Sequence, residues 1–295
     1  MRIAVTGSQG QVARSLTERG AEMGANIVAI GRPILDLADP STILPALRAA
    51  APDVIVNAAA YTGVDAAETE EASAHQINAE GANAVAKAAA ALSIPIIHLS
   101  TDYVFDGMLD TPYREEDVTR PLNAYGRSKL AGEEAVRNAA CRHVILRSAW
   151  VYSPFGKNFL RTMLALAESR QTVSVVADQF GQPTSALDIA DGILAICCRL
   201  RAQPEDNTLF GTFHMAAQGA ASWADLAEAI FAEREQHGRS RVRVSRIASR
   251  DYKTAARRPA NSRLDTAKLA RAYGILLPPW RQSVSEVVER LLATG

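Results

Sequence analysis

The stretch Arg2-Ile-Ala-Val-Thr-Gly-Ser-Gln-Gly-Gln-Val-Ala13 joins a short apolar run to a turn with two glycines and then to the start of a helix. This order of strand, glycine turn and helix is typical of a dinucleotide-binding unit. Gly7 is expected to allow the tight turn, and Gly10 to let a diphosphate approach the backbone. Gln11 and Val12 then open a helix whose amino end attracts phosphate groups. The stretch therefore predicts a dinucleotide site at the first strand.

Short apolar runs alternate with alanine-rich helical runs through the first half of the chain. We expect strands at residues 2–6, 26–31, 53–58, 94–100 and 143–148, and helices at 11–23, 41–51, 75–92 and 123–138. Apolar strands that alternate with helices indicate a parallel sheet covered on both faces, with right-handed crossovers. The predicted fold class is therefore α/β, a Rossmann-type doubly wound parallel sheet.

The rhythm changes after Trp150. Helices are expected at 159–169, 187–201, 222–235 and 283–292, strands at 172–176 and 211–215, and a solvated edge strand within 238–253. The predicted organisation is a dinucleotide-binding domain at 1–150, to which residues of about 180–218 return. Residues 151–295 are expected to form mainly a smaller, interleaved substrate domain.

The composition excludes several classes of protein. Of the 295 residues 48% are hydrophobic, and 32 basic residues balance 32 acidic ones. A net charge of zero gives no electrostatic reason to expect nucleic acid or an anionic membrane as a partner. The longest mostly apolar stretch, 84–92, is much shorter than the roughly 20 residues of a membrane helix. Three cysteines and no signal-peptide pattern at the start favour a soluble protein of the reducing cytoplasm.

Tyr125 and Lys129 stand four residues apart in a predicted helix, so both side chains lie on one face. A free tyrosine has a pKa of about 10, and a nearby cation is expected to lower that pKa. Thr101 follows the fourth strand, at the edge of the sheet where ligands bind in such folds. Together the three residues predict hydride transfer coupled to proton transfer, with Thr101 and Tyr125 on one substrate oxygen.

The second strand is followed by Arg32, where proteins specific for NAD usually carry an acid for the ribose hydroxyls. An arginine at this position suits a 2′-phosphate, so NADPH is the expected cofactor, with NADH as the alternative. A plain surface arginine is the other interpretation. Asp36 and Leu37 follow in the loop that is expected near the adenine.

Longer motifs extend over the whole chain. They are Asn57-Ala-Ala-Ala-Tyr-Thr-Gly-Val-Asp65, Ser100-Thr-Asp-Tyr-Val-Phe-Asp-Gly107, Pro121-Leu-Asn-Ala-Tyr-Gly-Arg-Ser-Lys-Leu-Ala-Gly-Glu133, Arg147-Ser-Ala-Trp-Val-Tyr152, Gly156-Lys-Asn-Phe159, Asp178-Gln-Phe-Gly-Gln-Pro-Thr184 and Arg258-Pro-Ala-Asn-Ser-Arg-Leu-Asp265. With these motifs the chain resembles the extended short-chain dehydrogenase/reductases and, within them, the dTDP-4-dehydrorhamnose reductase family. The resemblance runs from the first strand to the last helix.

The resemblance implies reduction of the C4 keto group of dTDP-4-dehydro-L-rhamnose to dTDP-L-rhamnose, a precursor of cell-surface polysaccharides. Tyr125 is implied as the general acid, Lys129 as the residue that holds the nicotinamide ribose, and Thr101 as the group that polarises the carbonyl. Asp102 and Trp150 match positions on the substrate side.

The resemblance also implies further binding residues. The loop that covers the cofactor matches Ala59, Ala60, Tyr61 and Thr62. Arg258 is expected to help hold the nucleotide diphosphate, because a guanidinium suits phosphate oxygens. Some family members dimerise through a magnesium ion on the first and last helices, but Arg14-Ser15-Leu16 lacks the acid. No metal is therefore expected, and a homodimer is left open.

Other functions remain open at this point. One is a different nucleotide-sugar 4-ketoreductase, an epimerase or a dehydratase, although Tyr103 stands where dehydratases carry a glutamate. Another is a non-catalytic, nucleotide-binding regulatory subunit, since the fold alone does not determine activity. Two further side chains are interpreted as structural: Glu133 on the surface or paired with a lysine, and Trp223 in the core.

Overall fold

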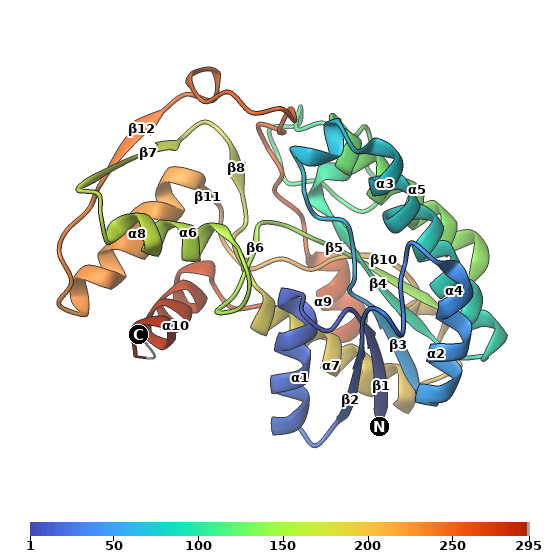
Figure 1. The fold of residues 1–295 in the computed structure, drawn as a ribbon. Coiled ribbons are helices and arrows are strands. Elements are labelled where there is room, and N and C mark those ends of the chain that lie inside the picture. Colours follow the sequence, from blue (N-terminus) through green and yellow to red (C-terminus); the bar gives the residue numbers. More distant parts are fainter. Residues whose placement is uncertain (294–295) are drawn as a thin grey trace.

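The computed structural model describes residues 1–293, and a large sheet with helices on both faces forms its centre (Figure 1). The sheet has six strands in the order β2-β1-β3-β4-β5-β10, and all neighbours are parallel. The strands are β1 (Arg2–Thr6), β2 (Asn26–Ile30), β3 (Val54–Asn57), β4 (Ile96–Thr101), β5 (His143–Ser148) and β10 (Gly211–His214). The prediction of a Rossmann-type α/β fold is confirmed.

Successive residues of the strands point to opposite faces of the sheet, and both faces are apolar. Ile3 and Val5 of β1 pack in a core with the helices of one face, whereas Ala4 packs with those of the other. The first face is covered by α1 (Gln11–Glu22), α7 (Ala186–Ala202) and α9 (Ala267–Tyr273), and the second by α2 (Ile43–Ala50), α4 (Ala82–Ala91) and α5 (Ala124–Ala139).

A second group of elements has its own apolar core beside the sheet (Figure 1). It contains β7 (Thr172–Val176) paired with β12 (Arg243–Ile247), the short pairs β6 (Val151–Tyr152) with β9 (Thr184–Ser185) and β8 (Phe180–Gly181) with β11 (Ala221–Ser222), and the helices α6 (Phe159–Ala167), α8 (Trp223–Gln236) and α10 (Trp280–Ala293). The expected edge strand within 238–253 is β12, whose side chains are largely exposed or half-buried.

The chain runs from β1 to β2 on one side and then crosses to β3 on the other side of β1. Ligands of open α/β sheets bind at such a switch point, beyond the carboxyl ends of the strands. One expected helix is interrupted: residues 75–92 form the end of α3 (Glu71–His75), a wider π-helical turn at Gln76–Gly81, and α4. The late strand expected at 211–215 is β10 at the edge of the sheet.

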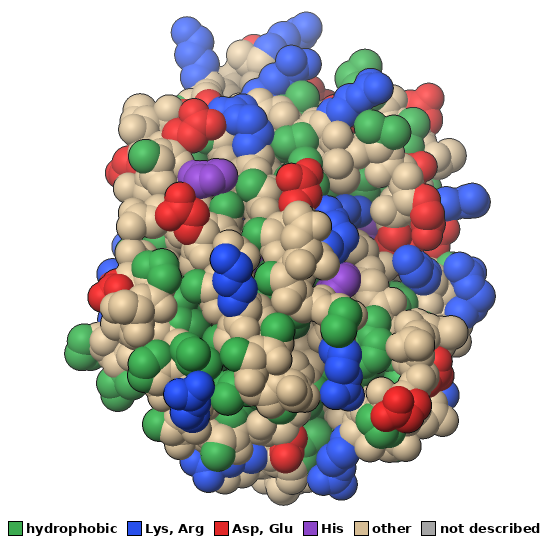
Figure 2. Space-filling view, turned by 90° about the vertical axis from the view of Figure 1, so that its right-hand side faces the viewer, with side chains coloured by type: hydrophobic (Ala, Val, Ile, Leu, Met, Phe, Trp, Pro, Cys, Tyr) green, Lys and Arg blue, Asp and Glu red, His purple; other side chains and the backbone are tan. Residues whose placement is uncertain are grey.

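The surface carries both signs of charge. Figure 2 shows basic and acidic side chains interspersed over the face that it presents, as expected for a chain without net charge. Among residues 1–293, no helix has the length and apolar character needed to cross a bilayer.

Candidate active site

The glycine turn after β1 is built to receive an anion. Gly7 has a φ of +83°, which only glycine adopts readily, and its N–H donates to the carbonyl of Ile30 at 2.7 Å. Gly10 precedes α1 without a side-chain cap, and the first turn of α1 carries no acid. The first N–H groups of α1 are thus left for a ligand. A Cβ on Gly10 would meet nothing within 4 Å, so open space lies there for a dinucleotide diphosphate.

A buried polar network holds the loop beside this turn. The Thr6 hydroxyl donates to Asn57 at 2.7 Å and accepts from the N–H of Ala59 at 3.0 Å. The Asn57 amide lies 3.0 Å from Nδ1 of His98, a ring that burial keeps neutral by holding its pKa well below the usual range. Asn78 then bonds both backbone groups of Tyr61, at 2.8 and 3.0 Å. The predicted cofactor loop at 59–62 is therefore fixed from two sides.

The other predicted cofactor residues differ in whether the side chain or only the backbone is available to a ligand. Arg32 follows β2 with an exposed side chain, next to the glycine turn. Leu37 is buried in the core, which leaves only its backbone for an adenine. The side-chain oxygen of Gln11 accepts from Ser153 at 2.8 Å and from Asn158 at 2.9 Å. Gln11 therefore has its backbone N–H, rather than its amide oxygen, for a phosphate.

The structure brings Thr101, Tyr125 and Lys129 together where β4 ends and α5 begins. Lys129 is buried and donates from Nζ to the carbonyl of Leu99 at 2.6 Å. Burial lowers the pKa of Lys129 to about 8, and the carboxylate of Glu133 opposes that shift. The backbone of β4 thus fixes the position of the Lys129 ammonium next to the carboxyl end of this strand.

The expectation that Lys129 lowers the pKa of Tyr125 is wrong for this structure. Desolvation raises the pKa of Tyr125 to about 12, the Thr101 hydroxyl acts in the lowering direction, and the charge of Asp102 raises the pKa further. Lys129 is not among the groups that shift this pKa, and its ammonium donates to the carbonyl of Leu99. Tyr125 is therefore a protonated phenol at neutral pH, which is the form that a proton donor needs.

Asp102 is the predicted substrate-side residue with the most unusual surroundings. It is 2% exposed, and its Oδ1 accepts from the Thr101 hydroxyl at 3.0 Å. Its Oδ2 is buried and has no hydrogen-bond partner within residues 1–293. Burial raises the pKa of Asp102 to about 7, while Ser262 and Thr101 act in the lowering direction. Asp102 therefore offers an unused oxygen beside the proton donor.

Glu133 is not on the surface and not paired with a lysine, as the sequence suggested. It is fully buried, and its carboxylate accepts from Arg147 at 2.9 and 2.7 Å and from the Ser100 hydroxyl at 2.5 Å. Arg147 lies on β5, 14 residues after Glu133, so no helical or strand spacing in the sequence predicts this contact. This ion pair connects α5, β4 and β5 directly behind Lys129.

Trp150 lies just after β5, at the junction of two apolar cores. Its φ is +48°, a conformation that non-glycine residues rarely adopt. Trp223, expected in the core, is instead half-buried and stacks on Trp150 with the ring centroids 3.6 Å apart. Stacked indoles of this kind form a flat apolar wall.

Arg258 lies on the loop that runs from β12 across to the α3 and α5 side of the molecule (Figure 1). Its Nη2 donates to Asp65 at 2.7 Å, and Asp65 also accepts from the N–H of Ala256 at 3.0 Å. The Nη1 atom of Arg258 is buried without a partner among the described residues. The sequence did not single out Asp65, whose partner is 193 residues away.

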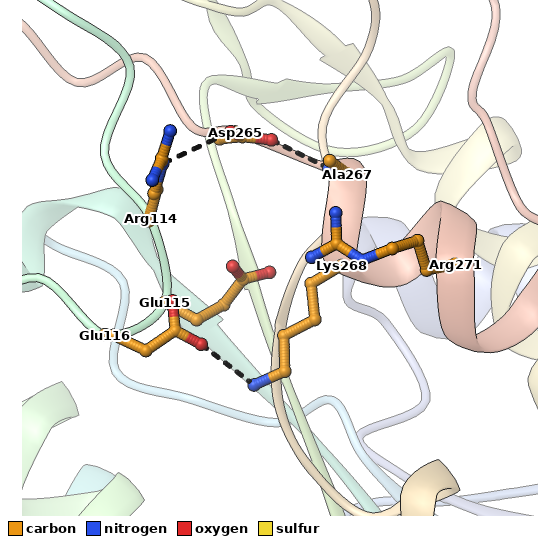
Figure 3. Close-up of a pocket in the computed structure, with 7 residues that line it drawn as sticks. All are labelled: Arg114, Glu115, Glu116, Asp265, Ala267, Lys268 and Arg271. Carbon is orange, nitrogen blue, oxygen red and sulfur yellow. Dashed lines mark hydrogen bonds and ion pairs between the residues drawn. The ribbon is translucent and has the colours of Figure 1, made fainter.

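A pocket of about 250 Å³ lies elsewhere, beside β10 and α9 (Figure 3). It is lined by Arg114, Glu115, Glu116, Asp265, Ala267, Lys268 and Arg271. Lys268 reaches Glu116 at 3.5 Å and Arg114 reaches Asp265 at 3.8 Å, so much of its charge is internally paired. Within the described part of the chain, none of the predicted site residues lines it.

The fold and the site define a class: a dinucleotide-dependent oxidoreductase of the short-chain dehydrogenase type. Its marks are a half-buried tyrosine, a buried lysine one helical turn later, and a threonine at the carboxyl edge of the sheet. Comparison with known proteins gives the family. A family model described as the RmlD substrate binding domain matches residues 1–293, and the chain belongs to this family.

The relatives agree with one another over the full chain. A dTDP-4-dehydrorhamnose reductase of Sinorhizobium fredii is 48% identical over 295 residues, covering 100% of this chain and 99% of the relative. The solved reductase of Clostridium acetobutylicum has a TM-score of 0.90 at 32% identity, covering 99% of this chain and 100% of that one. That of Bacillus anthracis, a complex with NADP, has a TM-score of 0.89 at 32% identity, covering 100% and 99%.

Proposed function

We propose that the protein reduces the C4 keto group of dTDP-4-dehydro-L-rhamnose, with NADPH as the preferred reductant and NADH as the alternative. The observation that carries the proposal is that Thr101, Tyr125 and Lys129 meet near the carboxyl end of β4, on the same edge of the sheet as the glycine turn after β1. Full-length relatives with this activity in their names support the same substrate. The cytoplasm is the proposed compartment, and the three free cysteines suit it.

The side chains of this chain supply binding and the proton. Tyr125, protonated with a pKa of about 12, donates its proton to the C4 oxygen as negative charge develops there. The Thr101 hydroxyl contacts the same oxygen, and the free Oδ2 of Asp102 accepts from a sugar hydroxyl. Lys129 holds the ribose next to the nicotinamide. The bound NADPH supplies the hydride.

The glycine turn and the loop at 59–62 are proposed to hold the cofactor. The open amino end of α1 receives the diphosphate, and exposed Arg32 meets the 2′-phosphate of NADPH. Asp36 and the backbone of Leu37 lie toward the adenine. Arg258 directs its unpartnered Nη1 to the diphosphate of the sugar nucleotide.

The test follows the absorbance of the reduced nicotinamide in a mixture of purified protein, NADPH or NADH, and dTDP-4-dehydro-L-rhamnose generated in situ. Substrate-dependent oxidation is the expected result, faster with NADPH. Arg32→Gln is expected to bring the two cofactor rates closer together. No oxidation by folded protein that binds the cofactor would contradict the proposal and favour another keto sugar or a regulatory role.

Two glycine substitutions separate binding from folding. Gly10→Ala is expected to weaken NADPH binding about tenfold, because the added methyl enters the space of the diphosphate while touching nothing in the protein. Gly7→Ala is expected to lower the free energy of unfolding by about 1–3 kcal/mol, because its φ of +83° strains any side chain. Titration of NADPH fluorescence and urea denaturation measure the two effects. Equal behaviour of the two variants would contradict this assignment.

Arg258→Gln is expected to raise the KM for the sugar nucleotide about 10- to 100-fold, because a charge-assisted contact to phosphate is lost. The KM for NADPH should stay within threefold. Arg257→Gln is the matched control, since the Arg257 side chain is exposed and the bond from the Asn123 amide goes to its backbone carbonyl. Steady-state kinetics with each substrate varied in turn measures the two KM values. An unchanged KM for the sugar nucleotide would show that Arg258 does not bind its diphosphate.

A further inference from the structure

Three aromatic rings from distant parts of the chain form one stack. The indoles of Trp150 and Trp223 are parallel within 4°, with centroids 3.6 Å apart. Phe159 packs against the same Trp223 ring at 4.7 Å, with a tilt of 46°. Trp223 is therefore the middle ring, and Trp150 is the end of the stack nearest to β4 and β5.

Trp223 and Phe159 are held rigidly at the beginnings of helices. Trp223 follows Ser222, which forms a reciprocal capping box with Asp225. Arg246 of β12 donates to the carboxylate of Asp225 and, at 3.3 Å, to the Ser222 hydroxyl. These bonds fix the first turn of α8 and so the position of the Trp223 ring.

Phe159 is held in place by contacts that lead to the glycine turn after β1. It follows Asn158, whose Oδ1 caps α6 by accepting from the N–H of Arg161 at 3.1 Å. The Asn158 amide also donates to Gln11 at 2.9 Å, and Gln11 is the first residue of α1 after Gly10. The stack is thus tied to the glycine turn.

Trp150 has much weaker support from its own backbone. Its φ of +48° is strained, and its carbonyl accepts one bond, from the N–H of Thr184 at 3.2 Å. Its indole forms no hydrogen bond with any described residue. A Cβ on Gly181 would overlap the ring, so the absence of a side chain there makes room for it. The Trp150 ring is therefore held by packing, with its stack on Trp223 and its contact with the backbone of Gly181, and not by hydrogen bonds to the described residues.

We propose that Trp223 is a positioning residue for substrate binding. It holds the Trp150 indole in the strained conformation in which that ring packs against the apolar C–H face of a 6-deoxyhexose. The inference rests on the proposed function, in which Trp150 lies against the deoxysugar. It adds that sugar affinity depends on a residue that itself need not touch the sugar.

Trp223→Ala is expected to raise the KM for the sugar nucleotide about tenfold. The kcat should change less than threefold, and the KM for NADPH should not change. Trp223→Phe should restore most of the affinity because it keeps a flat ring, whereas Trp223→Leu, which fills the space without a ring, should resemble Trp223→Ala. In near-ultraviolet circular dichroism, the signal of two coupled indoles should disappear in all three variants.

The experiment distinguishes a failure of the positioning role from a failure of the proposed function. A normal KM for the sugar nucleotide in Trp223→Ala would overturn the positioning role, and so would equal affinities of the Phe and Leu variants. A parallel loss of NADPH affinity, kcat and thermal stability would also overturn it, because that result indicates a folding role. Absence of turnover in the wild type would refute the proposed function itself before any variant is compared.

Discussion

Replacing Tyr125 by phenylalanine is expected to lower kcat by about 10²- to 10⁴-fold, the usual contribution of a positioned general acid. The pKa of about 12 means that the phenol holds its proton at neutral pH, and the variant has no proton to give to the developing alkoxide. Binding of NADPH should stay within threefold, because the substitution removes a single oxygen. Steady-state turnover and cofactor fluorescence measure the two quantities.

A second tyrosine variant serves as the control. The Tyr273 hydroxyl donates to the carbonyl of Leu209. Both residues belong to the core between the sheet and helices α1 and α7, and this core does not include Thr101 or Lys129. Tyr273→Phe should lose some stability and keep its kcat. Near-normal turnover in Tyr125→Phe would mean that another group donates the proton.

Replacing Glu133 by alanine is expected to lower the free energy of unfolding by about 3–5 kcal/mol. The Arg147 side chain is 4% exposed and would remain buried without its carboxylate partner. The adjacent Glu134→Ala is the matched control, since Glu134 is exposed and a change there should stay within about 0.5 kcal/mol. Urea denaturation at pH 7 compares the three proteins, and similar midpoints for both variants would contradict the prediction.

The same pair predicts a dependence on pH. Burial raises the pKa of Glu133, but the hydrogen bonds and charge of Arg147 outweigh burial and leave the pKa below its usual value. A lowered carboxyl pKa stabilises the folded state above the pKa of the unfolded chain, about 4.3, and the effect is lost as the pH falls through the folded pKa. The stability gap between wild type and Glu133→Ala should therefore narrow in acid. An equal gap at pH 7 and in acid would show that the carboxylate charge is not responsible.

The features that follow from the sequence are those set by neighbours along the chain. Gly7 and Gly10 stand at fixed places between a strand and a helix, so their turn could be predicted from local geometry. Tyr125 and Lys129 are one helical turn apart, which places them on one face in any structure that keeps the helix. The alternation of apolar strands and helices likewise indicates the parallel sheet, because each face of such a sheet must be covered.

Only the tertiary structure decided which distant groups meet and how deeply they are buried. Glu133 finds Arg147 on another element, Asp65 meets Arg258 across 193 residues, and Trp223 stacks on Trp150 although no spacing relates them. The direction of the pKa shift at Tyr125 also depends on the fold, since desolvation determines it and Lys129 is turned to Leu99. The sequence by itself determined the turn, the helix face and the class of chemistry. The packing determined the direction of the pKa shift of Tyr125 and the stacking of Trp223 on Trp150, because burial and long-range contacts exist only once the chain is folded.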